Sequence, residues 1–187
     1  MSRLLVLVFL LSAGSVAQAQ KIELGVVGGG LFSSGLPSTG TVEGSLAYRL
    51  FGVPMASLYF ELPIAGGFNN SIPVATPLLT CTNPCTLVTS YSSLFVGPGV
   101  KLKLAGGLPL SPFVTWGVGV AHFDQTRVSG NTSTNSALLQ FGGGLDWKIA
   151  PFLSLRGEVR DYYTGPAIGT GGRQHNVLGG AGVVLRF

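Results

Sequence analysis

The chain has 187 residues, with 11 Lys or Arg against 7 Asp or Glu, so its formal net charge is +4. Charged residues make up only 10% of it, against about 25% in ordinary soluble domains, and 46% are hydrophobic, which excludes intrinsic disorder. After residue 16 no apolar run approaches the roughly 18 residues that a spanning helix needs, which excludes a helical membrane protein. The 29 Gly and 11 Pro disfavour long helices and leave an all-β protein that is both apolar and glycine-rich.

Residues 1–19 have the pattern of a cleavable signal peptide. Arg3 provides a positive charge, residues 4–11 form an apolar stretch, and residues 17–19 (Ala-Gln-Ala) fit the small-x-small rule for cleavage. The alternative is a retained helical anchor, but the apolar run is short for spanning a bilayer. We therefore expect an exported chain whose mature part, residues 20–187, is long enough for one domain.

The mature chain divides into stretches of alternating apolar and polar residues, separated by turn residues. Such alternation is typical of β-strands, and each stretch is about as long as a strand that crosses a bilayer obliquely. Eight strands are predicted, at residues 21–32, 41–51, 56–66, 90–104, 113–124, 136–149, 153–163 and 173–187. Long connections, at residues 33–40, 67–89, 125–135 and 164–172, alternate with short ones. This pattern predicts an all-β fold, an eight-stranded antiparallel up-and-down transmembrane β-barrel.

Cys81 and Cys85 stand among Thr, Pro and Asn residues, a composition typical of a loop. In an oxidising compartment they favour a local disulfide, which stabilises only that loop because the ring is short. Metal binding and redox exchange are the alternatives. Neither is supported, since no His or acidic residue is nearby in the sequence and the spacing is not Cys-x-x-Cys.

The charged residues fall on one side of the predicted strands. Of the 17 in the mature chain, 13 lie at the alternate strand positions that face away from the apolar side chains, and four lie at loop ends. We call the alternate positions that share one face of the sheet a parity. A lipid-facing surface excludes charge in this way, because Arg or Lys at the bilayer midplane costs about 2–4 kcal/mol. A soluble β-sandwich also alternates, but the polar face of this chain is too rich in Gly to make a good solvent surface.

The charges on the polar parity are expected to point into the barrel and to plug it with ion pairs. The predicted network consists of Glu43, Arg49, Glu61, Lys101, Lys103, Asp146, Lys148, Arg156, Glu158 and Arg160. The whole interior parity carries eight basic and five acidic residues, a net charge of +3, so any leak would favour anions. Because most basic residues point inward, the basic composition does not indicate nucleic-acid binding.

Glycine recurs at alternate positions inside four predicted strands. The pairs are Gly97 with Gly99, Gly117 with Gly119, Gly142 with Gly144 and Gly180 with Gly182. They permit the tight curvature that a narrow barrel needs. A dinucleotide-binding loop would require a helix after the glycines, and more strand follows instead.

Aromatic residues gather toward the predicted strand ends, which is expected where a membrane meets water. They are Phe51, Phe113, Trp116, Trp147, Phe152 and Phe187 on the short-turn side, and Phe32, Phe68, Tyr91, Phe123, Tyr162 and Tyr163 on the long-loop side. The alternative is ordinary strand composition, in which aromatic residues are common.

The last third of the chain resembles a known family. The terminal Val183-Val184-Leu185-Arg186-Phe187 resembles the C-terminal signal of bacterial outer-membrane barrels, and residues 141–147 and 153–163 are similar to the penultimate hairpin of small barrels of the OmpA-transmembrane and OmpX type. The resemblance implies insertion into the outer membrane by the barrel-assembly machinery, with Val183, Leu185 and Phe187 as the assembly signal.

Three functions follow as hypotheses. The favoured one is a monomeric structural or surface-interaction protein with a plugged lumen, no cofactor and four extracellular loops. Arg127 and Arg173, near the outer rim, are candidates for contact with lipopolysaccharide phosphates, and the alternative is that they are solvated rim charges. The second is a narrow passive pore for small solutes. The third is an enzyme that modifies lipid A, for which His175 and Asp161 lie on the outward parity but no Ser of a deacylase motif is found, while His122 is expected to be isolated.

Overall fold

The structure, a computed structural model, describes residues 21–34, 38–53, 55–67, 88–105, 108–127, 130–165 and 172–187. The predicted signal peptide and the predicted disulfide between Cys81 and Cys85 lie outside these residues. In the described part of the chain, no helix has the length and apolar character needed to cross a membrane.

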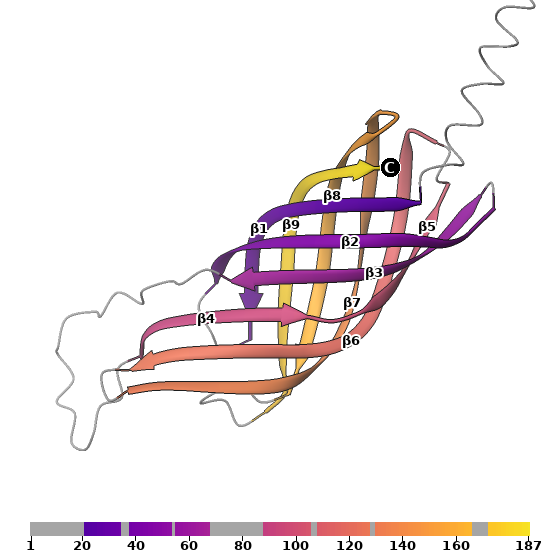
Figure 1. Ribbon diagram of the computed structural model, residues 1–187. Coiled ribbons are helices and arrows are strands. Elements are labelled where there is room, and N and C mark those ends of the chain that lie inside the picture. The colour runs from indigo at the N-terminus through magenta and orange to yellow at the C-terminus, as the bar shows by residue number, and fades with distance from the viewer. Residues whose placement is uncertain are drawn as a thin grey trace, which may run out of the picture.

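The described residues form nine β-strands in one closed antiparallel sheet (Figure 1). The strands are β1 (Ile22–Ser33), β2 (Thr39–Val53), β3 (Ala56–Gly67), β4 (Val88–Val96), β5 (Gly99–Leu104), β6 (Leu110–Arg127), β7 (Gly130–Ala150), β8 (Leu153–Thr164) and β9 (Gln174–Arg186). The first and last strands pair along ten residues or more, and mutual hydrogen bonds between the backbones of Ile22 and Phe187 end this seam. The predicted all-β transmembrane-type barrel is therefore confirmed.

Strands β4 and β5 are two halves of the single strand predicted at residues 90–104. Both pair with β3 on one side and β6 on the other, and the register is the same before and after the break at Gly97 and Pro98. Pro98 interrupts the ladder because it has no N–H to donate. Its carbonyl still accepts a hydrogen bond of 3.1 Å from the Val118 N–H, so the barrel has eight strand positions around its circumference.

The two faces of the sheet separate apolar from charged side chains. On β8, Leu155 and Val159 are 41% and 58% exposed, whereas the alternating Arg156 and Arg160 are at most 1% exposed. The same arrangement is found around the whole barrel: large apolar side chains form the outer surface, and most charged side chains are buried inside. Such a surface suits hydrocarbon rather than water as its surroundings.

Glycines on the inner face allow neighbouring strands to bend sharply toward each other. A Cβ built on Gly182 would collide with the carbonyl oxygen of Val26 across the β1–β9 seam, and one on Gly119 with that of Val96 across the β4–β6 seam. Gly28 and Gly179, on the outer face, have open space around the same position. The inner glycines therefore fix the curvature, as the alternating pattern predicts.

The predicted loop at residues 125–135 is wrong. Strands β6 and β7 remain paired up to Arg127 and Gly130, so the hairpin continues almost to its tip. Because the segment lacks apolar alternation, its sequence predicts a loop. Polar residues nevertheless form strands where neither face needs to meet lipid, and Thr132 and Thr134 favour the extended backbone.

Candidate functional site

The interior of the barrel holds most of the buried charged side chains of the described residues. Its charged side chains come from β1, β2, β3, β5, β7, β8 and β9, because each of these strands places its polar parity inside. We call the interior ion-pair cluster the lumen network, and define it by the residues Glu23, Glu43, Glu61, Lys101, Lys103, Asp146, Arg156, Glu158, Arg160 and Arg186.

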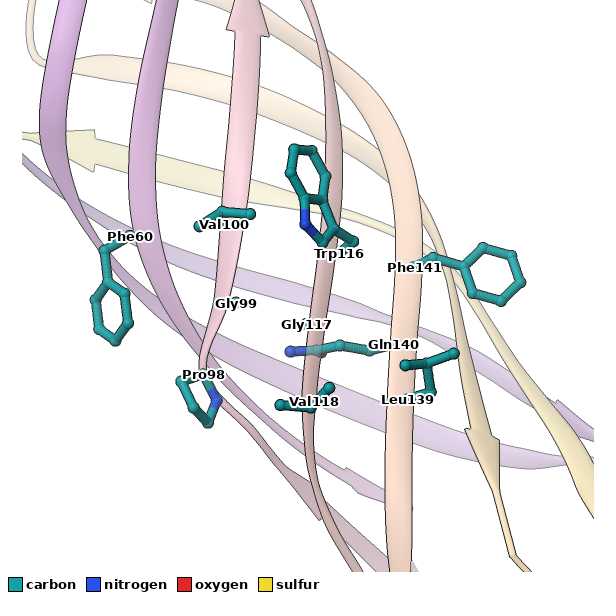
Figure 2. A pocket seen from close by; sticks show the side chains of 10 residues that line it. All are labelled: Phe60, Pro98, Gly99, Val100, Trp116, Gly117, Val118, Leu139, Gln140 and Phe141. Atoms are coloured by element: carbon teal, nitrogen blue, oxygen red, sulfur yellow. The ribbon is translucent and has the colours of Figure 1, made fainter.

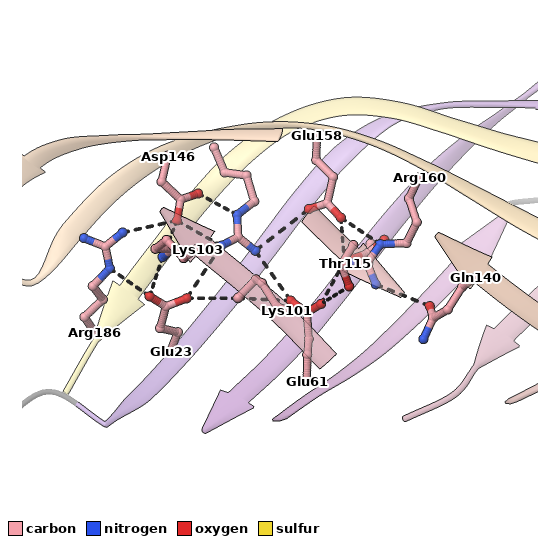
Figure 3. A network of polar contacts seen from close by, with 12 residues as sticks. Glu23, Glu61, Lys101, Lys103, Thr115, Gln140, Asp146, Glu158, Arg160 and Arg186 are labelled. Atoms are coloured by element: carbon pink, nitrogen blue, oxygen red, sulfur yellow. Dashed lines mark hydrogen bonds and ion pairs between the residues drawn. The ribbon is translucent and has the colours of Figure 1, made fainter. Parts of the chain in front are cut away.

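One half of the lumen network is centred on Asp146 (Figure 3). Arg156 donates two hydrogen bonds to it, from Nε to Oδ1 at 2.8 Å and from Nη2 to Oδ2 at 3.1 Å. Lys103 and Arg186 approach the same carboxylate at 2.6 and 3.2 Å and both also bind Glu23. Bidentate, charge-assisted contacts of this kind fix the orientation of the two side chains and also add interaction energy.

The other half is centred on Arg160. Its guanidinium lies 2.5 Å from Glu158 Oε1, 3.1 Å from Glu61 Oε2 and 3.4 Å from Glu43 Oε1. Arg160 Nη1 also donates to Gln140 Oε1 at 3.3 Å. Lys101 joins the two halves, since its Nζ is 3.1 Å from Glu61 and 2.9 Å from Glu23.

The lumen network is electrically balanced, with five basic and five acidic members. The net charge of +3 counted for the whole interior parity is therefore not carried by this cluster. The excess comes from Lys21, which is exposed, and from Arg49 and Lys148, which are half-buried outside the cluster. Charge balance matters because an uncompensated ion in such a place costs several kcal/mol.

The structure adds Glu23 and Arg186 to the predicted network. They occupy the polar parity of the first and last strands and are paired residues in the β1–β9 ladder. Arg186 Nε donates to Glu23 Oε1 at 3.1 Å. Closure of the barrel brings these two residues together although 163 positions separate them.

Aromatic and aliphatic side chains fill the interior on the side of the long connections. Phe95 stacks on Tyr162 with ring centroids 4.7 Å apart, and it meets Phe123 edge-on at 5.8 Å. Leu31 and Leu178 are buried in the same cluster. The membrane-belt interpretation is consequently wrong for four aromatic residues, whose side chains are buried inside: Tyr91, Phe113, Phe123 and Tyr162.

Tyr162 connects this apolar layer to the lumen network. Its hydroxyl donates a 2.6 Å hydrogen bond to Glu43 Oε2, and its ring stacks against Phe95. Along β8 the order from the short-turn end is Arg156, Glu158, Arg160 and then Tyr162. The ionic layer and the apolar layer therefore lie one after the other along the barrel.

Two histidines lie near the long-connection end of the barrel. His175 Nδ1 is 2.5 Å from Asp161 Oδ2, and its ring contacts Tyr163, over which Arg173 also lies. His122, expected to be isolated, is 2.6 Å from Asn135 Oδ1 and 3.2 Å from Asp124. The side chain of Arg127 is outside the described part.

Val183, Leu185 and Phe187 are exposed on the outer face at the end of β9. This is where an assembly signal would have to be accessible, but their role remains a prediction. Among the described residues, no group of three or more His, Cys, Asp or Glu side chains has an arrangement that could hold a metal ion.

No protein-family model matches the chain, and no curated protein matches it significantly. Solved structures match over most of its length. Neisserial surface protein A superposes with a TM-score of 0.61 at 14% identity, over 90% of this chain and 97% of that one. A major outer membrane protein from Thermus thermophilus has a TM-score of 0.59 at 16% identity, with 90% and 100% covered. The N-terminal barrel domain of Pseudomonas aeruginosa OprF has a TM-score of 0.53 at 13% identity, with 90% and 99% covered.

These likenesses show the fold. The chain has the fold of the small eight-stranded β-barrels of bacterial outer membranes, the fold that its resemblance to the OmpA and OmpX type implies. The apolar outer face fits a barrel whose surroundings are lipid.

Proposed function

We propose that this protein is a monomeric outer-membrane barrel with a closed lumen, and that it acts as a structural or surface-interaction protein through its extracellular loops. The single observation that carries the proposal is the filled interior. A balanced set of ten charges, nine of them on buried residues, and an apolar layer lie in series, and either layer alone opposes the passage of ions.

The proposal includes export by residues 1–19, a disulfide between Cys81 and Cys85, and delivery to the assembly machinery by Val183, Leu185 and Phe187. Lipopolysaccharide is the proposed lipid partner. Arg173 supports this role because it is exposed near the long-connection end of β9, where lipid phosphates meet the barrel.

A narrow passive pore is the second candidate. It would require a continuous water-filled path, whereas Phe95, Phe123 and Tyr162 are each at most 1% exposed. We therefore expect refolded protein in planar bilayers to give no discrete current steps at either polarity. Insertion is verified separately by the shift in electrophoretic mobility between unheated and boiled samples. Discrete channels from verified barrels would establish the pore and overturn the closed lumen.

A lipid-modifying enzyme is the remaining alternative, because Asp161 orients His175 as a base would be oriented. The side-chain contacts described for this His are to Asp161 and the Tyr163 ring, and neither provides an aliphatic hydroxyl nucleophile. We expect the mass of lipid A to be unchanged after incubation of lipopolysaccharide with the refolded protein. If the wild-type protein removed an acyl chain from lipid A and the His175→Ala variant did not, the protein would be an enzyme.

A further inference from the structure

The outer wall of the barrel is hollowed beside the break between β4 and β5 (Figure 2). The hollow has a volume of about 550 Å³, and its floor is formed by Pro98, Gly99 and Gly117. This volume is within the range of roughly 300–1,000 Å³ that is usual for small-ligand pockets. Its sides are formed by outward-facing side chains: Phe60, Val100, Trp116, Val118, Leu139 and Phe141.

The hollow results from the backbone at this seam. On the inner face, a Cβ at Gly117 would lie 2.5 Å from the Pro98 carbonyl oxygen, and one at Gly99 would lie 2.6 Å from that of Trp116. Glycines therefore let β5 and β6 bend sharply inward toward each other. Side chains on the outside of a sharp bend diverge, and Figure 2 shows Phe60 and Phe141 pointing to opposite sides of the floor.

The polar groups under the hollow are already partnered. Pro98 has no N–H, and its carbonyl accepts from Val118 N–H at 3.1 Å. The Gly97 carbonyl accepts a 2.8 Å hydrogen bond from Gln140 Nε2, whose side chain is buried on the interior side. None of the side chains that line the hollow is charged, and apart from the Trp116 indole N–H and the partnered Gln140 amide the lining is apolar. The site therefore suits an apolar occupant.

We propose that this hollow is a binding site for one acyl chain of a membrane lipid. It is continuous with the apolar band that faces the membrane, so the neighbouring molecules are lipid chains. Because apolar groups lose no water on associating inside a bilayer, packing contacts decide what binds there. A flexible chain fills a concave site, whereas the convex wall of a second barrel would leave it partly empty.

The two tryptophans of the chain provide the test. Trp116 borders the hollow, and Trp147 is exposed on the outer face away from it. The W147F variant, with Trp116 as its single tryptophan, is refolded in detergent and titrated with phosphatidylcholine brominated on its acyl chain. We expect quenching that saturates at one lipid per barrel. W116F, which keeps Trp147, is expected to show no quenching at that ratio.

A second pair of variants tests the position of the site. V118F in the W147F background fills the hollow and is expected to abolish the saturable quenching, whereas V159F on β8 leaves it intact. Equal quenching of both tryptophans that does not saturate would overturn the proposal, because it would show only ordinary contact with bulk lipid. Absence of quenching would also overturn it. A dimer in sedimentation that V118F dissociates would overturn it as well, because the hollow would then be occupied by a second copy of the chain. If V118F does not refold, the comparison of Trp116 with Trp147 alone decides.

Discussion

Replacing Arg160 with Met is expected to lower the free energy of unfolding of the barrel by about 3–5 kcal/mol. Arg160 contacts Glu43, Glu61 and Glu158, all of them buried, so its removal leaves three carboxylates facing one another without their shared cation. Methionine retains much of the length of the side chain and so limits the cavity. Urea titration of the protein in phospholipid vesicles, followed by tryptophan fluorescence, measures the change.

The matched control is Lys148→Met, because Lys148 has the same parity but is half-buried outside the lumen network. Its expected effect is within about 0.5 kcal/mol. Adding Glu158→Gln to Arg160→Met is expected to recover part of the loss, since Glu158 is then left with only Arg156, at 3.8 Å, and the second substitution removes its charge. A loss below about 1 kcal/mol for Arg160→Met would mean that water reaches these carboxylates, which contradicts a dry, closed lumen.

Replacing Gly182 with Ala is expected to destabilise the barrel by about 3 kcal/mol or more, at or beyond the upper end of ordinary overpacking. The added Cβ would collide with the carbonyl oxygen of Val26. A backbone oxygen cannot rotate aside as a side chain does, so relief requires β1 and β9 to separate where they close the barrel. The refolded fraction by heat-dependent electrophoretic mobility, and then urea titration, report the effect.

Gly179→Ala on the same strand is the control. Gly179 faces outward and no atom lies within 4 Å of an added Cβ, so we expect almost no change in the free energy of unfolding. Equal losses in the two variants would mean that the glycines act only through the flexibility of the unfolded chain. In that case the inner glycines would not determine the curvature.

Much of the fold is predictable from the alternation on single strands. On β8, Leu155 and Val159 alternate with Arg156 and Arg160, and a lipid-facing wall tolerates only one assignment of inside and outside. The break at Pro98 is harder to predict, because Phe95 and Lys101 keep the same parity on both sides of it. Pro98 indicates where the ladder could break, but both halves keep one pairing register with β3 and β6, so the alternation shows no break.

The extension of the β6–β7 hairpin escaped prediction for a different reason. Apolar alternation identifies a strand only where one face meets lipid or a core, and Asp124 is already polar on the outward parity. Beyond it, both faces are polar. The remaining signal is the strand preference of Thr132 and Thr134, which is weak beside the Ser, Asn and Gly around them.

For the interior site, parity predicts which side a residue faces but not which neighbours it meets. Arg160 and Tyr162 share a parity two positions apart, yet one belongs to the ionic layer and the other to the apolar layer. Strand tilt and stagger determine these layers, and they emerge only when the sheet closes. The pairing of Glu23 with Arg186 depends on that closure in the same way.

Transfer of the refolded protein from detergent into plain buffer tests most directly whether hydrocarbon surrounds the apolar outer face. The expected result is aggregation, because 32 large apolar side chains of the described residues are exposed in the isolated barrel, most of them on the outer face of the strands. Sedimentation and circular dichroism follow the transfer. A soluble monomer that keeps its strand signal without detergent would contradict the membrane-embedded barrel.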